Sequence, residues 1–169
     1  PSSPRSGSPR PDSPFRKVTV VEKGFLASGS TGRCGAGVRM QWGTEMNCRL
    51  AMYSIGFFEH AREELGYGRD IEFKQRGYLI VASTPKEERQ FRKNVALQNS
   101  LGIPSRCVSP EEAKRIVPHL DEKRFTMATF CEKDGHLNPF HVTQAFAEAA
   151  VREGVEILKH TTVTGIATE

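Results

Sequence analysis

Hydrophobic residues follow a strand-like pattern first and a helical pattern afterwards. Residues 18–21 form a short β-branched run, Val-Thr-Val-Val, which is typical of a buried strand and ends at Glu22. After a glycine-rich loop, apolar residues recur at helical spacing at positions 46, 50, 53, 57, 61 and 65. We therefore expect a helix over 44–65, with this apolar stripe in the core and Gly66 ending the helix.

The rest of the chain continues the alternation of strands and helices. A proline follows each of Thr84, Ser109 and Asn138, which is the pattern of a helix N-cap with proline at the first helical position. We expect helices that begin at these caps and end at Gly102, near Pro118 and at Gly154. Strands are expected over 71–73, 77–82, 124–132, 155–158 and 162–168. The predicted class is α/β, mixed with α+β character.

Residues 1–16 differ from the rest because they hold five of the ten prolines and five serines. Such a segment cannot bury enough apolar surface to offset its ordering entropy, so we expect it to be disordered. Residues 1–17 hold four basic and one acidic side chain, which leaves only +1 of the net +4 for the remainder. A nearly neutral body does not favour nucleic acid as a partner, although a phosphorylated or DNA-binding arm remains an alternative for the tail.

Length and composition restrict the class of protein further. The 169 residues suffice for one ordinary domain with a core. No apolar run approaches the roughly 18 residues of a membrane-spanning helix, so no transmembrane segment is predicted. The N-terminus lacks the apolar stretch of a signal peptide, and we expect a cytoplasmic protein. Four scattered cysteines without C-x-x-C spacing predict no metal site.

The glycine-rich loop after Glu22 carries the clearest candidate chemistry. Residues 28–39 combine glycines, hydroxyl side chains and two arginines. Glycines let backbone N–H groups approach a ligand, and hydroxyl and guanidinium groups suit a pyrophosphate. Glu22 ends its strand where dinucleotide-binding units place the acid that accepts hydrogen bonds from a ribose. The alternative is a plain surface loop after a strand that ends in a charged residue for solubility.

Four separated segments resemble the FAD-dependent D-amino-acid-oxidase superfamily, and they follow in colinear order over residues 17–169. They are VTVVEKGFLASGSTGRCGAGVR, QRGYLIVAS, EEAKRIVPHL and DGHLNPFHVTQAFAEAA. The resemblance is greatest to the β subunits of sarcosine oxidase and of dye-linked L-proline dehydrogenase. It implies FAD as the cofactor.

The resemblance implies positions for the parts of FAD. Glu22 would hold the adenosine ribose with Lys23 beside it, and Val163 would contact the adenine through its backbone. Ser30 and Thr31 would contact the pyrophosphate. Along the path to the flavin ring and near that ring would lie Arg33, Cys34, Gly35, Gly37, Gln41 and Trp42. No catalytic residue is assigned, because in this family the substrate-binding residues lie mainly beyond residue 169.

The resemblance also implies an architecture. Residues 17–66 and 133–169 would form an incomplete FAD-binding Rossmann-like domain, and 67–132 would begin the antiparallel sheet of a substrate domain. The chain departs from the family where a first strand and a G-x-G-x-x-G motif are expected, since residues 1–16 stand there. We therefore expect a fragment, a partial gene product whose first segment is replaced or frame-shifted.

The activity implied by the resemblance is oxidation of a C–N bond in an amino acid or secondary amine such as sarcosine, glycine or proline. A hydride passes from the C–H bond beside the amine to the flavin, and the imine hydrolyses. The implied partners are this small-molecule substrate and a partner subunit of a hetero-oligomeric dehydrogenase or oxidase. Two alternatives bind no flavin: a non-catalytic remnant of the fold and an assembly module.

Overall fold

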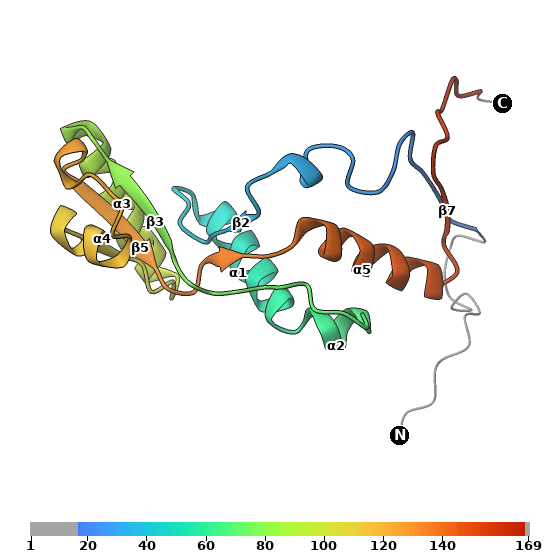
Figure 1. The fold of residues 1–169 in the computed structure, drawn as a ribbon, viewed down its shortest axis with the longest axis horizontal. Coiled ribbons are helices and arrows are strands. Elements are labelled where there is room, and N and C mark those ends of the chain that lie inside the picture. Colours follow the sequence, from blue (N-terminus) through green and yellow to red (C-terminus); the bar gives the residue numbers. More distant parts are fainter. Residues whose placement is uncertain (1–16, 168–169) are drawn as a thin grey trace. The chain divides into compact units, whose positions relative to one another are not determined.

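The computed structural model describes residues 17–167 (Figure 1). The expectations for residues 1–16 therefore lie outside the described residues. The chain divides into two compact units. The first comprises the described residues up to Gly35, then Ala61–Ile71, then the described residues from Asn138; the second comprises Ala36–His60 and Glu72–Leu137. The assignment of ranges to a cofactor domain and a substrate domain stays a prediction.

The first unit is built around two parallel strands, β1 (Thr19–Val21) and β7 (Glu156–Leu158), drawn in blue and red in Figure 1. Their register places Val20 opposite Ile157. Helix α5 (Pro139–Arg152) leads into β7. The unit also contains the short helix α2 (Ala61–Leu65) and the 3-10 turn η1 (Thr31–Arg33).

Helix α5 begins and ends where the sequence predicts. The side-chain oxygen of Asn138 accepts hydrogen bonds from the backbone N–H groups of Phe140 and His141, at 3.1 and 3.2 Å. At its other end Gly154 has a φ of +90°, which favours glycine and ends the helix.

The second unit contains an antiparallel sheet in the order β3-β5-β4. Its strands are β3 (Tyr78–Ala82), β5 (Met127–Cys131) and β4 (Arg106–Val108), and every residue of the central strand β5 is buried. Helix α3 (Pro85–Ser100), helix α4 (Pro110–Ile116) and the turn η2 (Glu122–Arg124) lie between these strands in the sequence. A short second pairing joins β2 (Gly37–Val38) to β6 (Gly135–His136). The predicted mixed α/β class is confirmed.

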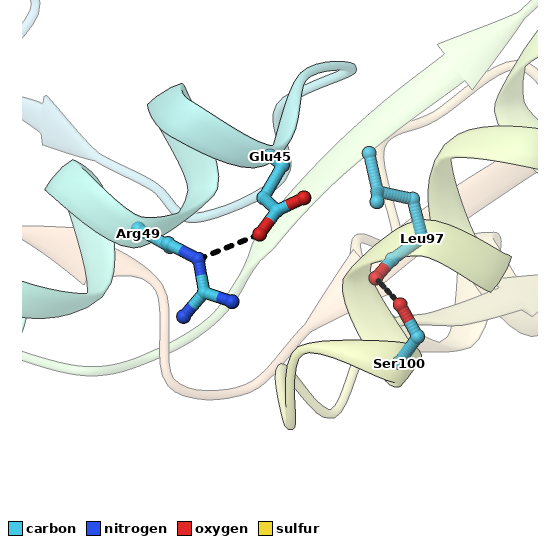
Figure 2. Close-up of polar contacts among 4 residues, drawn as sticks. All are labelled: Glu45, Arg49, Leu97 and Ser100. Carbon is cyan, nitrogen blue, oxygen red and sulfur yellow. Dashed lines mark hydrogen bonds and ion pairs between the residues drawn. The ribbon is translucent and has the colours of Figure 1, made fainter.

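Local side-chain contacts fix the ends of the helices in this unit. Thr84 accepts a hydrogen bond from the N–H of Glu87, and the Glu87 carboxylate accepts one from the N–H of Thr84, so the predicted N-cap at Thr84 is part of a capping box. At the end of α3 the Ser100 hydroxyl donates to the Leu97 carbonyl at 2.7 Å (Figure 2). At the start of α1 (Glu45–Glu59), Glu45 and Arg49 lie one helical turn apart and form an ion pair of 2.8 Å (Figure 2).

Two clusters of buried side chains lie in the core of the second unit. One packs the buried face of α1 against neighbouring segments, and its buried members are Met40, Cys48, Ile55, Ile103 and Cys131. The other joins α4 to the sheet, and its buried members are Val108, Ala113, Phe125, Ala128 and Phe130. The segment that precedes α1 is therefore anchored in the core through Met40.

The predicted core stripe of the 44–65 helix is wrong for its first three residues, whereas Ala61 and Leu65 at its end are buried. The helix breaks at His60, so that α1 and α2 are separate. Met46, Leu50 and Tyr53 are exposed by 67%, 58% and 78%, while the buried residues of α1 are Cys48 and Ile55. The helix carries apolar residues on two faces, and the face that packs is the one that meets Met40, Ile103 and Cys131.

Three strand predictions also need correction. The 18–21 run forms β1 but is exposed, because β1 pairs only with β7 in the described part of the chain. Residues 162–167 form no strand, and 71–73 form none either; beside 71–73, Lys74 makes an isolated bridge to His136. β propensity gave these segments an extended form, but a strand also requires a partner.

Candidate functional site

In the first unit, Glu22 lies where the carboxyl ends of two parallel strands meet. Its N–H donates to the carbonyl of Leu158, the last residue of β7, at 2.9 Å. Its own carbonyl accepts from the N–H of Thr161 at 3.0 Å, and the Gly24 carbonyl accepts from the N–H of His160 at 3.0 Å. The chain segments that leave β1 and β7 are thus joined side by side. This edge of a parallel sheet is where α/β proteins bind their ligands.

The Glu22 carboxylate is held in place by its own loop. Its Oε1 atom accepts a hydrogen bond of 2.7 Å from the N–H of Gly24, and the residue is half-buried. A carboxylate fixed at the strand end by a backbone donor keeps acceptor capacity for a second partner. Lys23 beside it is exposed, and Val163, in the segment after β7, is 62% exposed. The adenine contact of Val163 stays a prediction.

The loop that follows Glu22 is fixed against α5. A Cβ atom on Gly32 would lie 2.1 Å from the Ala27 carbonyl oxygen and 3.0 Å from the Phe140 ring, so only glycine fits there. By contrast, a Cβ on Gly29 or Gly35 would meet nothing within 4 Å. The loop is therefore packed closely at Gly32, whereas there is open space beside Gly29 and Gly35.

The polar side chains of this loop lie at the surface. Ser30 and Thr31, which are predicted to contact the pyrophosphate, are exposed, and so are Arg33 and Cys34, which are predicted to lie along the path to the flavin ring. Hydroxyl groups, a guanidinium group and unobstructed glycines suit an anionic ligand such as a pyrophosphate. The chemistry of this loop suits the pyrophosphate part of FAD, and the contacts of these residues with the cofactor stay predictions.

In the second unit, Gln41 is buried and Trp42 is partly exposed. The Gln41 amide nitrogen donates to the Tyr78 carbonyl at 2.8 Å and to Asp134 Oδ2 at 2.9 Å. Its amide oxygen is buried and meets no hydrogen-bond partner in the described part of the chain. Gly37 is glycine for a packing reason, because a Cβ there would lie 2.7 Å from the Tyr78 ring. Whether Gln41 and Trp42 lie near a flavin stays a prediction.

Sequence reasoning missed Arg39 as an individual candidate. Its guanidinium carbon lies 4.7 Å from the centre of the Trp42 ring and 5.7 Å from that of Tyr78. The Trp42 indole N–H donates to the Arg39 carbonyl at 3.0 Å. Beside them lies a cleft of about 370 Å³, lined by residues of 37–42 and by Leu50 and other residues of α1. A cation on aromatic faces at a cleft suits an anionic group such as a carboxylate.

Sequence reasoning also missed Asp134, a fully buried carboxylate. It accepts a 2.7 Å hydrogen bond from the N–H of Met40 in addition to the one from Gln41. Burial raises its pKa, while hydrogen bonds from Gln41 and Met40 oppose that rise. The only signal in the sequence is Asp-Gly, which is typical of an ordinary turn.

Neither a candidate metal site nor a membrane-spanning helix is found among the described residues. In the described part of the chain, no group of three His, Cys, Asp or Glu side chains is placed to hold a metal ion. No helix among residues 17–167 has the length and apolar character needed to cross a membrane.

Two known proteins with similar sequences are β subunits of sarcosine oxidase. The sarcosine oxidase β subunit of Rhodobacter capsulatus is 28% identical over 159 residues, which cover 92% of this chain and 38% of that protein. The sarcosine oxidase β subunit of an Arthrobacter species is 31% identical over 153 residues, covering 88% and 37%. The chain thus spans less than two fifths of the length of these relatives.

A solved structure is similar in both sequence and fold. The L-proline dehydrogenase of P. horikoshii superposes with a TM-score of 0.80 at 40% identity, over 90% of this chain and 40% of that one. The family model described as FAD dependent oxidoreductase matches residues 13–169. The chain therefore belongs to the family of FAD-dependent oxidoreductases.

Proposed function

We propose that the protein binds FAD and oxidises the C–N bond of an amino acid or secondary amine, such as sarcosine, glycine or proline. The observation that carries the proposal is the position of Glu22 at the carboxyl edge of β1 and β7, bonded to the segment that leaves β7. Membership of the family and the similarity to sarcosine oxidase subunits and L-proline dehydrogenase support the same function.

In this proposal the first unit binds the adenosine half of the cofactor. Glu22 accepts hydrogen bonds from the ribose hydroxyls, Lys23 lies beside it, and Val163 contacts the adenine. Ser30 and Thr31 bind the pyrophosphate. The residues assigned to the remaining length of FAD are Arg33, Cys34, Gly35, Gly37, Gln41 and Trp42.

The cofactor, when bound, supplies the chemistry by accepting a hydride from the carbon beside the amine nitrogen. The protein contributes binding and orientation. We assign Arg39 to the carboxylate of the substrate, because a guanidinium group binds a carboxylate through two parallel hydrogen bonds. Stacking on Trp42 and Tyr78 restricts the guanidinium plane, which reduces the entropy lost on binding.

A hetero-oligomeric assembly is the second part of the proposal. It is supported by the names of the two sarcosine oxidase relatives, each of which is a β subunit. A small-molecule amine or amino acid is the proposed substrate partner. The cytoplasmic location expected from the sequence stays a prediction.

Titration of the 169-residue chain with FAD, followed by quenching of flavin fluorescence, tests the cofactor part. We expect saturable binding that Glu22→Ala weakens and Glu22→Gln weakens less, because Gln keeps one acceptor oxygen for the Gly24 N–H. Glu63→Gln, an exposed acid on α2, is the matched control and should bind FAD as the parent chain does.

The absence of FAD binding would contradict the proposal, and thermal unfolding would then separate its alternatives. A cooperative transition without flavin binding would favour an assembly module that keeps the fold. The lack of any cooperative transition would favour a non-catalytic remnant.

A further inference from the structure

Asp134 joins three segments of the second unit through neutral donors. It lies between β5 and β6, in the turn that begins where its own N–H donates to the Cys131 carbonyl at 3.3 Å. Its carboxylate holds the backbone of Met40 and the side chain of Gln41. Its backbone carbonyl accepts a 2.9 Å hydrogen bond from Gly77, the residue before β3. The side chain is fully buried, and none of the ion pairs among the described residues involves it.

The arrangement requires a carboxylate rather than another polar group. Met40 presents a backbone N–H to Oδ1, and Gln41 presents its amide nitrogen to Oδ2. The Gln41 amide has one orientation, because both of its neighbours, the Tyr78 carbonyl and Asp134, are acceptors. An Asn at position 134 would offer one acceptor and one donor to these two donors, and would leave one of them buried without a partner.

The atoms held by Asp134 lie directly between Arg39 and Trp42 in the chain. Arg39 and Trp42 are joined by the indole N–H that donates to the Arg39 carbonyl, and by the stacking of the guanidinium on the ring. Met40 and Gln41, between them, are buried, while Trp42 is 38% exposed at the cleft. Asp134 therefore fixes the inner side of a short segment whose outer side carries the cation and the aromatic ring.

We propose that Asp134 is a positioning residue that holds residues 39–42 so that the Arg39 guanidinium is presented to a carboxylate ligand at the cleft. Asp134 itself does not touch the ligand. The carboxylate ligand in this inference rests on the proposed function; the positioning of residues 39–42 does not, and it can be tested without any ligand.

Trp42 reports on this segment directly, because it is the only tryptophan in the chain. Trp42 is excited selectively in the parent chain and in Asp134→Asn. Its emission maximum and its quenching by acrylamide are then compared between the two chains. We expect a red shift and stronger quenching in Asp134→Asn, with far-ultraviolet circular dichroism unchanged. Asp121→Asn, an acid at the start of η2, is the control and should leave Trp42 emission unchanged. Unchanged Trp42 emission and quenching in a folded Asp134→Asn would overturn the proposal.

Exchanging the amide of Gln41 with the carboxylate of Asp134 distinguishes a loss of positioning from a general loss of packing. Gln41→Glu alone places two carboxylates together in the core, and we expect the largest exposure of Trp42 in this variant. In the double variant Gln41→Glu with Asp134→Asn, the amide introduced at position 134 can donate to the carboxylate introduced at position 41. Trp42 should then be less exposed than in Gln41→Glu alone. A double variant as exposed as, or more exposed than, that single variant would also overturn the proposal.

The ligand arm uses L-proline as the probe, titrated into the FAD-treated chain and followed by Trp42 emission. Saturable binding in the parent chain and its loss or weakening in Asp134→Asn would support the whole inference. If the parent chain binds neither FAD nor L-proline while Asp134→Asn still exposes Trp42, the proposed function fails and the positioning role stands. Equal L-proline binding by the parent chain and Asp134→Asn would overturn the functional role of Asp134.

Discussion

The carbonyl oxygen of Lys74 lies 2.1 Å from the position that a Cβ atom on Gly135 would occupy. The two segments are joined there, because the N–H of His136 donates to that carbonyl and the N–H of Lys74 donates to the carbonyl of His136. Glycine at position 135 thus permits the close approach of two backbones directly beside Asp134.

Gly135→Ala should destabilise the protein by about 1–3 kcal/mol or more, because the backbone must shift to admit a methyl group. Urea unfolding measures the change. Gly56→Ala in the last turn of α1, where an added Cβ meets nothing within 4 Å, is the control. It should stabilise by about 0.5–1 kcal/mol through helix propensity. Equal effects of the two substitutions would contradict the close approach.

The N-caps of α1 and α3 offer a matched pair of threonines. Thr84 caps α3 through its side chain, whereas the Thr44 side chain accepts no capping hydrogen bond at α1. Thr84→Ala should therefore cost about 0.5–2 kcal/mol of stability. Thr44→Ala should cost clearly less. Thermal or urea unfolding of both variants checks the difference, and a larger cost at Thr44 would refute it.

The stability of the protein should depend on pH through Asp134. Burial raises the pKa of this carboxyl in the folded protein above its value in the unfolded chain. Protonated Asp134 therefore favours folding; this contribution is complete below the ordinary pKa of about 4 and is lost as the pH rises through the raised pKa. Arg39 is the nearby cation and opposes the rise, and the buried thiol of Cys131, whose pKa is also raised, stays protonated over this range.

Urea unfolding at a series of pH values isolates this effect when the parent chain and Asp134→Asn are compared. The free energy of unfolding of the parent chain, relative to the variant, should fall as the pH rises from about 3 to about 7. Subtracting the free energy of unfolding of Asp134→Asn from that of the parent chain removes the contribution of every titratable group that both chains contain. A difference that stays constant with pH would show that Asp134 titrates alike in the folded and unfolded chains.

Arg39→Lys should weaken binding of a carboxylate substrate roughly tenfold to a hundredfold, the equivalent of one charge-assisted hydrogen bond. Lysine keeps the charge but loses the planar fork and the stacking on Trp42 and Tyr78. Arg49→Lys on α1, where Arg49 pairs with Glu45, is the control. Titration of L-proline with detection by Trp42 emission measures both. Equal affinities in the two variants would remove Arg39 from the site.

The parts of the fold that the sequence predicted well are those that local chemistry determines. The starts of α3, α4 and α5 follow from Thr84, Ser109 and Asn138, whose side chains bond to N–H groups two or three residues away. The buried face of α1 was not predictable in this way. That helix has two apolar faces, and the choice depends on residues far along the chain, such as Ile103 and Cys131.

In the candidate site, too, features that depend on neighbouring residues were predictable, and those that depend on distant residues were not. The position of Glu22 at the end of a strand was predictable, because its neighbours in the sequence, a strand and a glycine-rich loop, are also its neighbours in space. Asp134 was not, since its partners Met40 and Gln41 are 94 and 93 residues away. An Asp-Gly pair has the same appearance in a solvated turn and in a buried hydrogen-bond network.

The pairing of β1 with β7 also determines the order in which the chain can fold. Thr19 and Glu156, which face each other across the two strands, are 137 residues apart. Closing a loop of that length costs entropy that few contacts of a two-stranded sheet offset. During synthesis, the antiparallel sheet between residues 78 and 131 is complete before β7 has been made. The edge that carries Glu22 therefore cannot form until β7 has left the ribosome, after the strands of that antiparallel sheet.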